Sequence, residues 1–247
     1  MTANRSMSRD LTTPDVALAI VAHPDDAEFQ CGATLAKWAA AGCEVHHLIC
    51  TDGSKGTWDV DCDQEELVAT RQVEQRAAAQ TLGATGEVWF LGRVDGELDS
   101  DLRTRSEVAR IIRQVRPSVV LGHDPWKQYR LHPDHRHAGL LAVEAVVAAR
   151  DPFFFPDHGV AHHRPDALLL FEAQDADHAE DTAGFGAVKT AALLEHVSQY
   201  VTTHDITHPD DEDQRARFAA WVDAALVAGG EQAGVASAEL YRLIGDL

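Results

Sequence analysis

The chain has 247 residues, with 40 Asp and Glu against 21 Lys and Arg and a formal net charge of −19. This length suits one α/β domain with a substantial core. The acidic balance argues against nucleic acids and anionic membranes as partners, because both attract basic surfaces. The apolar run 16–22 is too short for a bilayer span or a secretory leader, so we expect a cytoplasmic protein.

Short apolar runs alternate with segments of helical periodicity along most of the chain. We expect strands at 16–22, 44–50, 87–91, 118–121 and 167–171, and helices at 28–41, 64–82, 108–115, 132–150, 186–196 and 218–226. The alternation predicts an α/β fold, a Rossmann-like and mostly parallel sheet with helices on both faces. We expect one domain over 1–247, with 1–13 flexible and 151–247 forming a smaller lobe that caps the substrate.

Polar side chains follow four of the expected strands. They are His23, Asp25 and Asp26 after the first strand, Thr51 and Asp52 after the second, residues 92–95 after the third, and His123 and Asp124 after the fourth. In parallel sheets of this kind, ligands bind beyond the carboxyl ends of the strands. We therefore expect one site at this edge of the sheet.

Two segments, 23–26 and 132–135, combine imidazole and carboxylate side chains around a proline that stiffens the backbone. Zinc in hydrolases takes three protein ligands and keeps a fourth position for water. His23, Asp26 and His135 would supply two nitrogens and one oxygen, which predicts a zinc site at the carboxyl edge of the strands. The same ligand types also suit Fe²⁺ and Co²⁺, so the residues alone leave the metal open.

Three further residues of these segments are candidates for proton transfer and charge stabilisation. Asp25 is not needed as a ligand and is placed to act as general base beside the metal. His132, as an imidazolium, would stabilise the oxyanion that develops on an amide carbonyl. Asp134 would orient His132 and favour its charged form. A metal ion lowers the pKa of water to about 7, which makes amide hydrolysis the predicted chemistry.

Residues 22–28, Ala-His-Pro-Asp-Asp-Ala-Glu, followed by Cys31-Gly32-Ala33-Thr34, strongly resemble the signature of the PIG-L, or LmbE-like, deacetylase family. Residues 132–136 with Gly139 resemble the second motif of that family, and weaker matches extend the resemblance over roughly 15–200. The resemblance implies a Rossmann-like sheet and hydrolysis of N-acetyl groups. The family's substrates include N-acetylglucosamine attached to inositol, to malate or to antibiotic scaffolds.

The resemblance also implies roles for single residues, and these agree with the chemistry above. His23, Asp26 and His135 match metal ligands, Asp25 matches the general base, His132 matches the group that stabilises the tetrahedral intermediate, and Asp134 matches its orienting partner. Arg71 matches a position implicated in substrate binding in some members. Asp95, which follows the third strand, is our own candidate for binding sugar hydroxyls.

We predict a zinc-dependent hydrolase that removes an acetyl group from an amino sugar or an N-acetylglucosaminyl conjugate. Its partner is then a small molecule, and the sequence leaves a homo-oligomer open. Three alternatives remain: an amidase of mycothiol-type conjugates, a metal-binding module without catalysis, and an iron oxygenase with the same ligand types.

Two other residues near this edge keep two interpretations each. Trp58, after the glycine-containing loop 53–57, either stacks on a sugar or packs against the protein. His123 either reaches the site or is an ordinary packed histidine.

Overall fold

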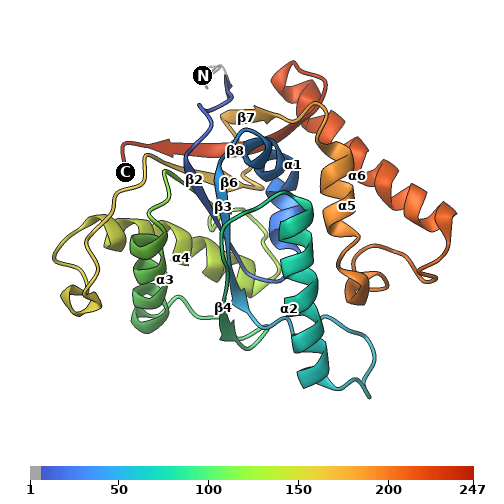
Figure 1. The fold of residues 1–247 in the computed structure, drawn as a ribbon, viewed down its shortest axis with the longest axis horizontal. Coiled ribbons are helices and arrows are strands. Elements are labelled where there is room, and N and C mark those ends of the chain that lie inside the picture. The colour runs from blue at the N-terminus through green and yellow to red at the C-terminus, as the bar shows by residue number, and fades with distance from the viewer. Residues whose placement is uncertain (1–6) are drawn as a thin grey trace.

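The computed structural model describes residues 7–247, which form one eight-stranded sheet flanked by helices (Figure 1). The strands are β1 (Ser8–Arg9), β2 (Val16–Val21), β3 (Glu44–Thr51), β4 (Val88–Arg93), β5 (Val119–His123), β6 (Ala167–Phe171), β7 (His178–Asp181) and β8 (Ala238–Gly245). Their order across the sheet is β1-β7-β8-β6-β5-β2-β3-β4. Only β8 pairs antiparallel within the described residues, with β6 and β7, so the predicted mostly parallel sheet is confirmed.

Helices cover both faces of this sheet, as predicted. They are α1 (Asp26–Ala40), α2 (Gln64–Thr81), α3 (Leu102–Val115), α4 (Pro133–Arg150), α5 (Gly186–Leu193) and α6 (Glu212–Ala233), with short 3₁₀ turns η1 (Pro156–His158) and η2 (Val197–Gln199). Side chains of β2 alternate between two cores, because successive strand residues point to opposite faces. Leu18 and Ile20 pack with α3 and α4, whereas Ala19 and Val21 pack with α1, α2 and α5.

Three strands at one side of the sheet were not expected from the sequence. β1 has two residues, β7 is mostly polar, and β8 is antiparallel, so none is the fully apolar run that marks a buried parallel strand. Ser8 lies in β1, where we expected a flexible segment, because its backbone N–H donates to Asp177 O at 2.8 Å. Residues 1–6 of that segment lie outside the described residues.

The second half of the chain shares this sheet with the first half. Strands β6, β7 and β8 all belong to it, and α6 packs on β8 and α5 (Figure 1). No helix within residues 7–247 has the length and apolar character needed to cross a bilayer.

Helix α1 is bent at Cys31, where φ is −144° and ψ is 15°. The bend frees backbone N–H groups that a straight helix would bond internally. The carboxylate of Glu239, on β8, accepts from Ala33 N at 3.1 Å and from Thr34 N at 2.8 Å. Lys189 of α5 donates to the same carboxylate at 2.7 Å. The C-terminal strand therefore caps the second half of the helix whose first turn carries Asp26.

Candidate active site

The site lies where the order of the strands in the sheet reverses, between β2 and β5. The chain goes from β2 outward to β3 and β4 on one side, and then returns to β5 on the other side of β2. This switch point opens a crevice at the carboxyl ends of the strands. Loops after neighbouring strands meet there: Thr51 Oγ1 donates to Ala22 O at 2.9 Å, and Asp95 N donates to Asp52 Oδ1 at 3.0 Å. The expected convergence of these loops is present.

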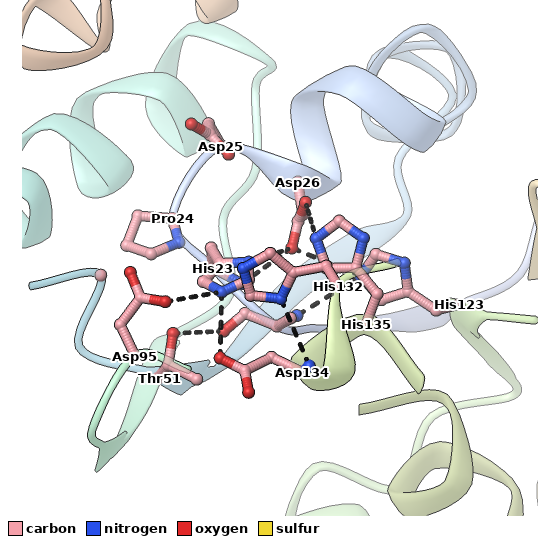
Figure 2. Close-up of polar contacts among 12 residues, drawn as sticks. His23, Pro24, Asp25, Asp26, Thr51, Asp95, His123, His132, Asp134 and His135 are labelled. Carbon is pink, nitrogen blue, oxygen red and sulfur yellow. Dashed lines mark hydrogen bonds and ion pairs between the residues drawn. The ribbon is translucent and has the colours of Figure 1, made fainter. Parts of the chain in front are cut away.

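The three residues predicted as metal ligands are brought together around Asp26 (Figure 2). Asp26 Oδ2 lies 3.4 Å from His23 Nδ1, and Asp26 Oδ1 lies 3.3 Å from His135 Nε2. Three sets of donor atoms among the described residues lie within 4.8 Å of one another: His23, His132 and His135; His23, Asp95, His132 and Asp134; and Asp26, His123 and His135. The predicted ligand set is thus divided between overlapping clusters.

His123, for which the sequence left two interpretations, lies in this cluster. It is fully buried, its Nε2 lies 3.3 Å from Asp26 Oδ2, and its ring stacks on His135 with centroids 4.4 Å apart. Glu172 holds the other ring nitrogen at 3.2 Å, and Arg130 donates to both Glu172 and His135. His123 is the last residue of the central strand β5, in agreement with its expected place at this edge of the sheet.

Asp134 contacts a different histidine from the one we expected. Its fully buried carboxylate lies 3.2 Å from His23 Nε2 and accepts from the backbone N–H groups of Gly96 and Leu98 at 2.6 and 3.2 Å. His132 instead caps α4, because its Nδ1 accepts from Asp134 N at 3.3 Å. The Asp134 carboxylate is occupied by these two backbone amides and His23, and within the described residues it makes no hydrogen bond to the His132 ring.

The charge state expected for His132 also changes. Burial lowers the pKa of His132, and the neighbouring His23 and His135 lower it further. The structure therefore favours a neutral imidazole rather than the imidazolium that the sequence led us to expect. The Asp134 N–H at Nδ1 leaves the ring proton on Nε2, the nitrogen that remains free to donate.

Negative charge is concentrated around His23. Burial by itself would lower the pKa of His23, but the carboxylates of Asp134, Asp26 and Asp95 raise it well above its usual range. Imidazole nitrogens and carboxylate oxygens are the donors that zinc takes, and an excess of buried carboxylates is balanced by a divalent cation. The residues present at this corner therefore fit a divalent metal ion.

Asp25 has a strained backbone held by two side chains of α2. Its φ is 98°, in the left-handed region that non-glycine residues rarely adopt, and such strain clusters at active sites. Gln75 Oε1 accepts from Asp25 N at 2.8 Å, and Arg71 Nη2 donates to Pro24 O at 2.6 Å and to Asp25 Oδ2 at 3.2 Å. Burial raises the pKa of Asp25 to about 6, although Arg71 acts in the opposite direction. A pKa near neutrality suits a group that accepts and returns a proton.

The two predicted substrate-binding residues lie at the cavity but already have partners in the protein. Arg71 is 3% exposed and also donates to Gly53 O at 2.9 Å. A Cβ at Gly53 would lie 2.7 Å from Arg71 Nη1, so the loop needs glycine to approach the guanidinium. Asp95 contacts His23 Nε2 at 3.2 Å and accepts from Lys55 N at 3.2 Å.

A cavity of about 530 Å³ opens in front of these groups, within the range of about 300–1,000 Å³ that small-molecule sites occupy. One end of the cavity is formed by Asp25 and by a group that we call the metal-type corner, which consists of His23, Asp26, His132 and His135. The remaining wall comes from the loop after β3, from Phe29 and Gln30 of α1, from residues around η2, and from Trp221 of α6. The wall combines aromatic rings with polar side chains, which is the usual composition of a site for a small organic ligand.

Fold and site together define an α/β protein with a metal-type donor cluster and a strained carboxylate at the switch point of its sheet. Residues 18–146 match the family model described as PIG-L, GlcNAc-PI de-N-acetylase. The chain belongs to this PIG-L, or LmbE-like, family.

Relatives with assigned activities cover most of the chain. It is 36% identical to diacetylchitobiose deacetylase of Thermococcus kodakarensis over 74% of its own length and 69% of the relative's. It is 32% identical to 1D-myo-inositol 2-acetamido-2-deoxy-alpha-D-glucopyranoside deacetylase of Streptomyces scabiei, over 89% and 76% of the two chains. The crystal structure of N,N'-diacetylchitobiose deacetylase from Pyrococcus horikoshii superposes with a TM-score of 0.83 at 28% identity, covering 94% of this chain and 84% of that one.

Proposed function

We propose that this chain is a metal-dependent hydrolase that removes the N-acetyl group from an N-acetylglucosaminyl conjugate. The observation that carries the proposal is the strained Asp25 beside Asp26, which places a spare carboxylate next to the metal-type cluster at the end of the cavity. Membership of the family, and the deacetylases among its relatives, support the same reaction. Zinc is our first choice of metal, with Fe²⁺ and Co²⁺ as alternatives.

In this proposal His23, Asp26 and His135 hold the ion, and His123 stands beside Asp26 as a further donor. A bound divalent ion supplies a lowered pKa for water and polarises the acetyl carbonyl. Gln75 and Arg71 keep Asp25 in its strained position, so that its carboxylate faces the cavity without needing to reorganise.

Asp25 accepts the proton of the attacking water, and the C–O bond forms at the acetyl carbon. His132 Nε2–H donates to the oxygen that becomes negative, a role that a neutral ring fulfils as well as the imidazolium we first expected. The proton on Asp25 then passes to the amide nitrogen as the C–N bond breaks, which releases acetate and the free amine. Arg71 and Asp95, at the cavity wall, would contact sugar hydroxyls.

The test is a product assay with the purified, zinc-loaded chain on N-acetylglucosamine, N,N'-diacetylchitobiose and N-acetylglucosaminyl-inositol. We expect equal amounts of acetate and free amine. Asp25→Asn should lower kcat by about 10²–10⁴-fold, the usual contribution of a general base, whereas the exposed Asp210→Asn should leave it unchanged.

The other functions predict different products. Release of a larger acid from a mycothiol-type conjugate would support the amidase, and activity that requires oxygen and a 2-oxoacid would support the oxygenase. Metal binding without any amide hydrolysis would support a binding module and contradict our proposal.

A further inference from the structure

An exposed indole forms part of the cavity wall far along the chain from the metal-type corner. Trp221 of α6 is 58% exposed, although it belongs to an aromatic cluster. Its ring lies 6.0 Å from the ring of buried Phe218, nearly parallel at 21°, and 6.2 Å from the ring of Phe29, edge-on at 76°. The cluster fixes one side of the indole and leaves the rest uncovered. A rigid apolar surface that faces a cavity marks a binding site.

The cavity continues past this indole. Thr203 and Trp221 line both the main cavity and a second cavity of about 330 Å³, so the two cavities adjoin. Thr202 also lines the main cavity, as does Trp58, which is 79% exposed. A ligand that starts at the metal-type corner therefore has room to extend across Trp221, with polar groups along the path.

We propose that Trp221 is the stacking platform for a second ring, attached to the amino sugar whose acetyl group is removed. This inference rests on the proposed deacetylase function and adds a specificity-determining residue for conjugates in which a pyranose or cyclitol follows the N-acetylglucosamine. Such rings carry hydroxyls at the edge and C–H groups on the faces. The faces fit an indole, and the edge fits the hydroxyls of Thr202 and Thr203.

Trp221 lies outside residues 18–146, the part of the chain that matches the family model. The reacting groups lie inside that range, so the second-ring site is a separate element of the cavity. Removing the indole should then weaken the binding of two-ring substrates without disturbing the chemistry.

The experiment compares Trp221→Ala with the wild-type chain on N-acetylglucosamine, N,N'-diacetylchitobiose and N-acetylglucosaminyl-inositol. We expect kcat/KM to fall about tenfold for one or both two-ring substrates, through KM, and less than twofold for the monosaccharide. The two conjugates distinguish a pyranose from a cyclitol. Trp221→Phe should retain most of the preference, because a flat ring remains.

Trp126→Ala is the matched control, since Trp126 is 63% exposed and lines neither of the two cavities. Equal losses on all three substrates, or no loss on any, would overturn the assignment of Trp221. If Trp58→Ala alone removes the preference for two rings, the platform is on the opposite loop and our assignment is wrong.

Failure of the deacetylase function has its own signature, which is that wild-type protein releases no acetate from any substrate. The stacking proposal is then tested by tryptophan fluorescence during titration with N,N'-diacetylchitobiose. Quenching that is lost in Trp221→Phe but kept in Trp126→Phe supports the platform, and quenching that is equal in both variants contradicts it.

Discussion

The metal-type corner and the C-terminal side of the sheet both bury charge, but they balance it in different ways. On the C-terminal side, Lys189 pairs with Glu239 at 2.7 Å and Lys37 pairs with Glu180. In the corner, carboxylates surround His23 and face a group of imidazoles. Buried charge is costly unless it is compensated. The comparison indicates that the C-terminal side balances its buried charge with its own lysines, whereas the charge of the metal-type corner is balanced by a bound cation.

The largest effect should come from removing that cation or a donor. We expect a chelator, or His135→Ala, to lower deacetylase activity by about a thousandfold or more, because the charge stabilisation supplied by the metal is lost. Activity assays before and after zinc is restored would measure this. Full activity of the metal-free chain would contradict the inference that the metal-type corner needs a cation.

His137→Ala is the control for that experiment. His137 is on the same helix, two residues beyond His135, and contacts Ser100 rather than the cluster. Its variant should keep both metal content and activity.

The next largest effect concerns stability on the C-terminal side. Lys189→Met leaves the carboxylate of Glu239 buried without its cation, and we expect the free energy of unfolding to fall by about 3–5 kcal/mol. Denaturant unfolding would measure the change. The double variant with Glu239→Gln should lose less than the sum of the two single variants, and strict additivity would show that the two residues are not coupled.

A smaller effect on rate should follow from Gln75→Leu. Gln75 accepts from Asp25 N and donates to Glu28 Oε1 at 2.8 Å, so the variant frees the strained turn. We expect kcat to fall about 10–100-fold while KM stays within about twofold, since the base is displaced and the substrate wall is not. Gln80→Leu, exposed on the same helix, should have no effect on kcat. A change in KM alone would contradict the positioning role.

The smallest effect is a dependence of stability on pH. Burial alone would raise the pKa of Glu180, but His178 and Lys37 lower it below its usual value. A carboxyl whose pKa is lower in the folded state stabilises the fold above the pKa of the unfolded chain. That stability is lost as the pH falls toward the folded value. The difference in unfolding free energy between wild type and Glu180→Gln should therefore shrink as the pH is lowered from 7 to below about 4. A difference that grows in acid would contradict this assignment.

The central strands and the first cluster could be predicted because their signals are local. The run 16–22 is wholly apolar and leads directly into a His-Pro-Asp-Asp turn, so strand and site follow from one short segment. The β7 segment His178–Asp181 carries no such signal. Its polar side chains are tolerated only because partners distant in the sequence, such as Lys37, meet them.

The pairing inside the site could not be read from spacing. Asp134 is two residues from His132, and proximity in sequence suggested that they are partners. The actual partner, His23, depends on how α4 sits against β2, which is a tertiary property. The sequence could not decide between the two interpretations of His123 for the same reason, since only the fold places Asp26 and His135 beside it.

The bend in α1 bears on the order in which the protein can be completed during synthesis. The amides of Ala33 and Thr34 find their acceptor in Glu239, more than 200 positions later in the chain. Until Glu239 has been synthesised, the second half of the helix that begins at Asp26 lacks this cap. Completion of this part of α1 thus waits for Glu239 to emerge, so chains that terminate before Glu239 would lack the cap even though they contain both histidine motifs.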